Sequence, residues 1–151
     1  MSRSLPGSAR DVALLVARIV LGVVLIAHGW QKLATNGIAA TIDAFAGIGV
    51  PLAPVAAVVA TAVELVGGVL LVAGAATAVV GGLVVLTMLG AGLFVHTGNG
   101  IFAADGGWEL VGVIAAAALA LAATGAGRFS VDHAVASRGA AAPAESSRAA
   151  A

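Results

Sequence analysis

The stretch Pro54–Ala75, "PVAAVVATAVELVGGVLLVAGA", decides the fold class of this chain. It is apolar apart from one carboxylate, Glu64. Its length is close to the roughly 20 residues that an α-helix needs to cross about 30 Å of hydrocarbon. Three further apolar stretches of similar size lie at residues 12–33, 77–97 and 109–126. The sequence therefore predicts an all-α integral membrane protein, a four-helix bundle with one span in each stretch.

The composition favours the same interpretation. The chain has 151 residues, of which 61% are hydrophobic and 9% charged, and its mean hydropathy is +1.12. An ordinary soluble domain is about one quarter charged, so these few polar groups could not cover a soluble globule of this size. The formal net charge of zero gives no indication of a nucleic-acid partner. The absence of cysteine excludes disulfides, thiolate metal sites and Fe–S clusters held by this chain.

Basic residues gather at the two ends of the chain. The amino-terminal segment, residues 1–11, and the tail, residues 130–151, flank a predicted transmembrane domain at 12–129. The basic residues in or next to these two segments are Arg3, Arg10, Arg128, Arg138 and Arg148, whereas the two longer connections between spans contain only Lys32. The positive-inside rule then places both termini in the cytoplasm, which agrees with four spans. The Ala-rich tail lacks an apolar period and is predicted to be disordered.

Two connections carry local signals. The turn between the second and third spans is very short, and we expect Gly74 to cap the second and Thr77 to cap the third. The longer connection after the first span places Ile38, Ile42 and Phe45 at helical spacing. This spacing predicts a short helix that lies in the membrane interface.

Arg18 and Glu64 are the clearest ionisable residues inside the predicted spans. A charge there costs at least ~2.5 kcal/mol on insertion scales, so such residues usually face protein or water. Both lie on faces that also carry glycine, and we predict that they form an ion pair between the first two spans. The pair could lock the register of the helices, or serve as a proton relay or a polar anchor for a quinone-like ligand. In a third interpretation, Arg18 extends to the headgroups and Glu64 is protonated.

A second set of polar residues is predicted at the outer face. Its members are His28, Lys32, His96, Asp105 and Glu109. Two histidines on different helices could ligate a haem or, with a carboxylate, a metal ion. Interfacial histidine and lysine commonly contact lipid headgroups instead. We therefore assign no metal site and no catalytic residue from the sequence.

Several motifs in order resemble those of the DoxX family of small four-helix bacterial membrane proteins. They are "GVVLIAHGWQKL", "VELVGGVLLVAG", "GNGIF", "GGWE" and "GAGRFSVD", and the resemblance extends over residues 17–132. It implies a multi-pass protein of the bacterial plasma membrane. The arginine, the two glutamates and the lysine of the family pattern correspond to Arg18, Glu64, Glu109 and Lys32.

The resemblance also implies a connection with redox chemistry, since the family is named from a subunit of a terminal quinol oxidase and related proteins are associated with thiosulfate:quinone oxidoreductase. We expect an accessory subunit of a respiratory or oxidative-stress complex that lacks independent catalysis. The alternatives are a quinone-reactive oxidoreductase subunit and a small transporter or channel. No covalent cofactor is expected, but a quinone or lipid could lie between the helices. The expected partners are membrane lipid and either a protein of a redox complex or further copies of the chain.

Overall fold

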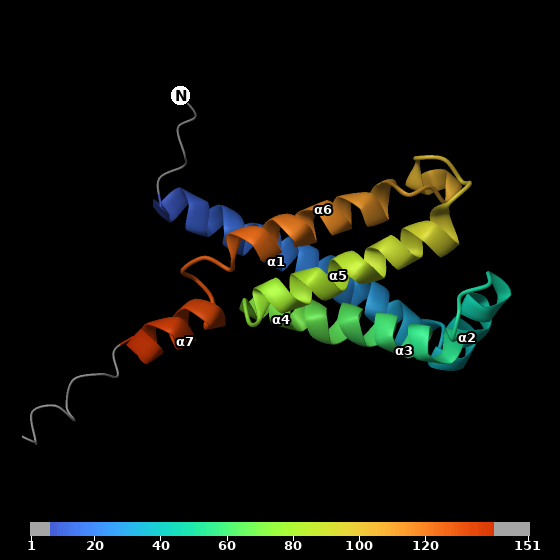
Figure 1. Cartoon of the computed structure of the whole chain (residues 1–151), viewed down its shortest axis with the longest axis horizontal. Coiled ribbons are helices and arrows are strands. Elements are labelled where there is room, and N and C mark those ends of the chain that lie inside the picture. The colour runs from blue at the N-terminus through green and yellow to red at the C-terminus, as the bar shows by residue number, and fades with distance from the viewer. Residues whose placement is uncertain (1–6, 141–151) are drawn as a thin grey trace, which may run out of the picture.

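The computed structural model describes residues 7–140, which are helical apart from short connections and contain no strand (Figure 1). This confirms the predicted all-α class. The long helices are α1 (Gly7–Trp30), α5 (Thr77–Ala91) and α6 (Glu109–Thr124), with shorter helices α2 (Ile38–Gly47), α3 (Ala53–Ala62), α4 (Gly68–Ala73) and α7 (Val131–Ala140). Three π-helical segments, η1 (Gln31–Thr35), η2 (Val63–Gly67) and η3 (Gly92–His96), and a 3-10 turn, η4 (Ala103–Asp105), complete the order.

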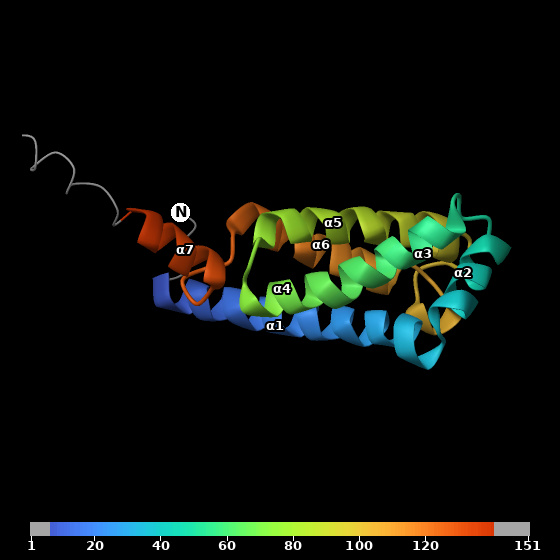
Figure 2. The same cartoon turned by 90° about the horizontal axis from the view of Figure 1, so that it is seen from below.

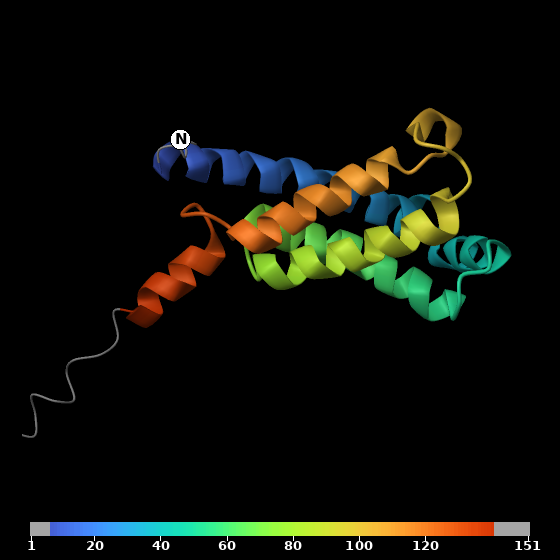
Figure 3. The same ribbon diagram turned by 45° about the horizontal axis from the view of Figure 1, so that its top comes forward.

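The helices run lengthwise beside one another. Segment η2 joins α3 to α4, so residues 53–73 form one rod, which packs along α1, while α5 packs along α6 (Figure 2). The described chain begins and ends at the same end of the bundle, which we name the terminal end (Figures 1 and 3). Helix α2 and the loop of residues 97–108 lie at the opposite end, named here the loop end (Figure 1).

Within residues 7–140, three helical stretches are long and apolar enough to cross a membrane: Gly7–Thr35, Ala53–Ala73 and Thr77–His96. Helix α6 is equally apolar but shorter, with 16 residues. At 1.5 Å per residue it is about 24 Å long, compared with about 30 Å of hydrocarbon. Many large apolar side chains on the long helices point outward, such as Val20, Leu86 and Val113, and these are the surfaces that lipid would cover.

Small residues allow the helices to approach closely. A Cβ on Gly22 of α1 would lie 2.6 Å from the carbonyl oxygen of Gly68, and one on Gly68 would lie 2.8 Å from that of Gly22. Gly81 of α5 packs in the same way against Ala118 of α6, whose carbonyl oxygen would be 2.8 Å from an added Cβ. Close approach of backbones at small residues is typical of membrane helices. The Gly22–Gly68 contact fixes the register of α1 against the rod.

The predicted disordered tail is wrong for residues 131–140, which form α7. Alanine is the best helix former, so its abundance there favours a helix. The start of α7 is also anchored, since the amide of Asp132 donates to the carbonyl oxygen of Gly74 at 2.9 Å. Residues 1–6 and 141–151, including Arg3, Arg148 and the rest of the predicted tail, lie outside the described residues.

The turn between α4 and α5 follows the prediction at one end only. Gly74 caps α4 in the left-handed conformation, with φ of 70°. Thr77 is not the cap of α5 but its first residue, and Ala76 holds the capping position with φ of 50°. The missing side-chain cap is supplied by a residue distant in sequence, Asp132, as described below.

Candidate functional site

Glu64 and Lys32 form the ion pair of the bundle. Nζ of Lys32 donates to Oε1 of Glu64 at 2.9 Å and to Oε2 at 2.7 Å. The Glu64 side chain is 5% exposed and that of Lys32 is 21% exposed. Among residues 7–140 this is the pair of opposite charges within 4 Å. It joins η1, which follows α1, to η2 in the middle of the rod.

The local structure on both sides fixes this pair. Gly29, one turn before Lys32, packs so closely on the rod that an added Cβ would lie 3.0 Å from Cβ of Glu64. Both charged residues lie in π-helical segments, Lys32 in η1 and Glu64 in η2. The hydroxyl of Thr41 in α2 donates to the carbonyl oxygen of Lys32 at 3.1 Å. Single π turns in helices often occur at functional sites, and here they position the polar groups.

Arg18 lies at the terminal end and binds backbone carbonyls. Its guanidinium donates to Phe129 at 2.6 Å, to Leu71 at 3.3 Å and to Val72 at 3.4 Å. The side chain is fully buried. Leu71 and Val72 belong to the last turn of α4, where carbonyl groups lack intrahelical partners and carry partial negative charge. Arg18 therefore caps α4 and holds the segment before α7 against it.

The structure does not bring Arg18 and Glu64 together, and the predicted pairing must be corrected. The physical reason is the direction of side chains, which in an α-helix point toward its amino terminus. Arg18 therefore points toward the terminal end, away from Glu64. Lys32 points back along α1, and Glu64, on a rod of opposite direction, points toward Lys32. The polar path through Arg18 and Glu64 that a transporter would use is accordingly not formed.

Asp132, at the start of α7, caps α5 from a distance. Its Oδ1 accepts from the amide of Ala76 at 2.7 Å and its Oδ2 from that of Thr77 at 2.9 Å. Burial acts to raise the pKa of Asp132, but the amide hydrogen bonds of Thr77 and Ala76 and the charge of Arg18 outweigh it and lower the pKa. Asp132 is not among the site residues predicted from the sequence. The motif "GAGRFSVD", which ends on it, was the available signal.

The remaining predicted residues of the outer face contact backbone groups. His28 Nδ1 lies 2.9 Å from the carbonyl oxygen of Val24, one turn back. His96 Nδ1 lies 2.6 Å from that of Gly106, and Glu109 Oε1 accepts from the amide of Ala103 at 2.7 Å. Asp105 ends the 3-10 turn η4 and is exposed. Lys32, the fifth predicted residue, binds Glu64 instead. Over residues 7–140, no three histidine or carboxylate side chains gather closely enough to hold a metal ion.

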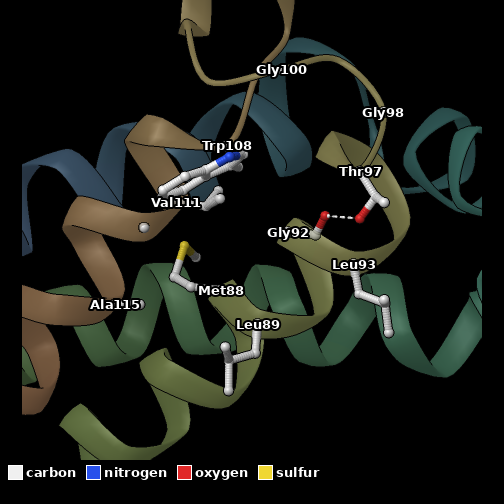
Figure 4. A pocket seen from close by; sticks show the side chains of 11 residues that line it. Met88, Leu89, Gly92, Leu93, Thr97, Gly98, Gly100, Trp108, Val111 and Ala115 are labelled. Carbon is white, nitrogen blue, oxygen red and sulfur yellow. Dashed lines mark hydrogen bonds between the residues drawn. The ribbon is translucent and has the colours of Figure 1, made fainter.

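An apolar groove of about 540 Å³ opens between α5–η3 and α6 at the loop end (Figure 4). Met88, Gly92 and Leu93 line it from α5 and η3, and Trp108, Val111 and Ala115 from the side of α6. The hydroxyl of Thr97 donates to the carbonyl oxygen of Gly92 at 2.8 Å (Figure 4). None of His28, Lys32, His96, Asp105 and Glu109 lines the groove.

Fold and site together define an α-helical membrane protein whose buried charges are bound by its own groups. The family model "DoxX" matches residues 13–97, from α1 to the end of the third candidate span. The chain therefore belongs to the DoxX family. The matched region contains Arg18, Lys32 and Glu64, whereas Glu109 and Asp132 lie beyond it.

Two relatives add to this result. "Putative oxidoreductase CatD" of Bacillus subtilis (strain 168) is 40% identical over 81 residues, which cover 54% of this chain and 58% of the relative. "Inner membrane protein YphA" of Escherichia coli (strain K12) is 33% identical over 133 residues, which cover 84% of this chain and 93% of the relative. No solved structure matches. Family, relative and apolar helices together show a multi-pass protein of the bacterial inner membrane.

Proposed function

We propose that this protein is a four-span accessory subunit of a redox complex in the bacterial inner membrane and has no catalysis of its own. The observation that carries the proposal is that the chain's own groups bind its buried charges, apart from Nε of Arg18, which is buried without a hydrogen-bond partner. Glu64 accepts two hydrogen bonds from Lys32, and Arg18 is bound to three carbonyl oxygens. Groups held in this way stabilise the packing of helices. The name of CatD, an oxidoreductase, supports the association with redox chemistry.

The fourth span of the proposal is α6. Its 16 residues are apolar, and it runs along α5 for most of the length of that helix (Figure 2). Four crossings return the chain to the side where it began, which agrees with the common position of both described ends. We place the terminal end in the cytoplasm, because Arg10, Arg128 and Arg138 lie there and Lys32 lies at the opposite end.

The absence of native cysteine allows this topology to be tested without background. Asn99→Cys introduces a thiol in the loop end, and Ser137→Cys introduces one on α7. In intact cells an impermeant maleimide should label the first variant, and the second only after permeabilisation. Labelling of the second variant in intact cells would contradict the proposed orientation. If both variants were labelled in intact cells, or both only after permeabilisation, the loop end and the terminal end could not lie on opposite sides of the membrane.

The accessory role is tested by native mass spectrometry of the tagged protein released from its own membrane in mild detergent. We expect it to leave with subunits that carry redox cofactors. A strain in which an unrelated inner-membrane protein carries the same tag provides the control for nonspecific co-purification. Release of the protein alone, or as a homo-oligomer, would contradict the accessory role.

A quinone-reactive subunit is the second candidate, and the apolar groove favours it. The groove lies at the level of Trp108, beside the boundary between the helices and the loop, and could hold a quinone ring (Figure 4). A Cβ on Gly92 would meet only Val111, at 3.9 Å, so Gly92→Leu would fill the groove without a backbone clash. Gly90→Leu, on the same helix but outside the groove, is the matched control. Loss of bound quinone in the first variant alone would favour this candidate over the accessory role.

A further inference from the structure

A polar pocket of about 300 Å³ lies at the terminal end, whereas the groove lies at the loop end. Arg10 and Asp11 at the start of α1 contribute to it, and Arg128, Ser130, Asp132 and His133 contribute from the segment between α6 and α7. The backbone of this segment lies directly on α1, since a Cβ on Gly127 would be 3.3 Å from Oδ1 of Asp11. The pocket is thus formed by residues more than a hundred positions apart in sequence.

The two guanidinium groups of this pocket form no ion pair with its two carboxylates, Asp11 and Asp132, among the described residues. In the part of the chain that the structure describes, neither Arg10 nor Arg128 has a carboxylate oxygen within 4 Å of its guanidinium. Arg10 donates one hydrogen bond, to the carbonyl oxygen of Thr124 at 3.1 Å. Both carboxylates of the pocket are engaged elsewhere, because Asp132 accepts from the amides that begin α5 and Asp11 accepts from the amide of Arg128 at 3.1 Å.

The smaller polar groups of the pocket are also engaged. Oγ of Ser130 donates to the carbonyl oxygen of Gly127 at 2.5 Å and accepts from the amide of His133 at 3.1 Å. Among the side chains that line the pocket, the N–H groups left to receive an additional ligand are therefore those of the two guanidinium groups and of the His133 imidazole. A guanidinium presents donors in a fork that matches the oxygens of a phosphate group. The pocket accordingly has the chemistry of an anion site.

The surroundings of the pocket indicate where the anion comes from. Phe129, which follows Arg128, is 56% exposed, and Val12, which follows Asp11, is 50% exposed. In a multi-pass membrane protein these apolar side chains, beside two guanidinium groups without carboxylate partners, face the boundary between headgroups and acyl chains. Basic pockets at the ends of membrane helices bind anionic lipid headgroups. We propose that Arg10 and Arg128 bind the phosphate of an anionic phospholipid, whose chains then lie along α1 and Phe129.

Binding would have a structural consequence. The phosphate would connect the start of α1 to the segment of residues 125–130, and that segment also presents the Phe129 carbonyl to Arg18. A bound lipid would therefore stabilise the docking of α7 on the bundle. This inference does not depend on the proposed redox association, and it concerns a different end of the molecule from the groove.

The test uses the full-length protein and native mass spectrometry with titrated phosphatidylglycerol; phosphatidylcholine, which is zwitterionic and has no net charge, is the reference lipid. Each basic residue near an anionic surface contributes enough to change binding about fivefold. We expect Arg10→Gln and Arg128→Gln each to weaken phosphatidylglycerol binding about fivefold, and the double variant about 25-fold, with no change for phosphatidylcholine. Arg138→Gln, on α7 but outside the pocket, is the matched control and should bind as the unmodified chain does.

Two results would overturn the proposal. The first is equal loss of binding in Arg138→Gln, which would mean that only the general charge of this end matters. The second is displacement of the lipid by millimolar inorganic phosphate, which would identify a site for free anions. Thermal unfolding of each variant in phosphatidylcholine nanodiscs verifies folding. If the double variant does not fold, the two single variants still decide the question.

Discussion

The pairing of Lys32 with Glu64 makes a prediction that separates it from any pairing of Glu64 with Arg18. Lys32→Met removes the cation and leaves the Glu64 carboxylate, 5% exposed, without its partner. Loss of one member of a buried ion pair typically costs about 3–5 kcal/mol. Glu64→Gln is milder, because an amide oxygen can still accept from Lys32, and Lys32 at 21% exposure can reach polar surroundings. We expect about 1–2 kcal/mol for that variant, the cost of weakening a charged hydrogen bond.

The double variant Lys32→Met/Glu64→Gln contains no unpaired charge and should cost less than the sum of the two single changes. The expected coupling is about 2–3 kcal/mol, in the upper part of the range for directly contacting groups. The same cycle with Arg18→Met and Glu64→Gln should be additive within about 0.5 kcal/mol, as for sites without shared partners. Equilibrium unfolding in mixed micelles, followed by the fluorescence of Trp30 and Trp108, measures each value. Coupling to Arg18 as large as that to Lys32 would refute the geometry.

Three further predictions concern the terminal and loop ends. Gly74→Ala should destabilise the protein by about 2–4 kcal/mol in the same unfolding assay, because it strains a left-handed residue and displaces the Arg18 guanidinium. Gly82→Ala, which has open space around its Cβ, is the control and should be neutral or stabilising. Because the pKa of Asp132 is lowered in the folded protein, the ionised carboxylate stabilises the fold above the ordinary aspartate pKa of 3.8, and this stability is lost as the pH falls through the folded pKa. Asp132→Asn should therefore flatten the acid limb of a curve of stability against pH, and an unchanged limb would contradict the cap. Glu109→Gln should increase hydrogen exchange at the Ala103 amide, because that amide donates to the Glu109 carboxylate. Asp105→Asn leaves this hydrogen bond in place and is the control, so equal exchange in the two variants would exclude the Ala103–Glu109 contact.

The apolar segments allowed the helices to be predicted because each buried face repeats at helical spacing. In α1, for example, Leu21, Leu25 and Gly29 are buried at intervals of four. Close packing at glycine could also be predicted, and the structure locates it at Gly22 and Gly68. The partner of Glu64 was predicted wrongly, because the prediction used the glycine-bearing faces of the spans and left out side-chain direction. Direction is fixed by chain polarity alone, so the sequence already contained the information that favours Lys32.

Other contacts could not be predicted from local sequence. Asp132 caps α5 across more than fifty residues, and its role depends on how the segment after α6 folds back on the bundle. An Ala-rich composition is compatible with both a helix and a disordered tail, so α7 depended on that docking. The groove arises from the separation of α5–η3 and α6 near Trp108, and this separation is a property of packing that no single motif encodes.

The charged contacts of Arg18 and Lys32 lie in one half of the bundle, formed by α1 and the rod, and not in the other half, formed by α5 and α6. Two cations, Arg18 in the middle of α1 and Lys32 in η1 just beyond its end, lie about 21 Å apart along the helix axis at 1.5 Å per residue, and both bind the rod of residues 53–73. Helices α5 and α6 are instead held by small residues such as Gly81 and Ala118, and the described chain has no ion pair between them. The groove opens between these two helices. Because the groove lies between helices that carry neither of these charged contacts, a ligand can enter it without breaking them. A ligand or partner that acts on this protein should therefore engage that half.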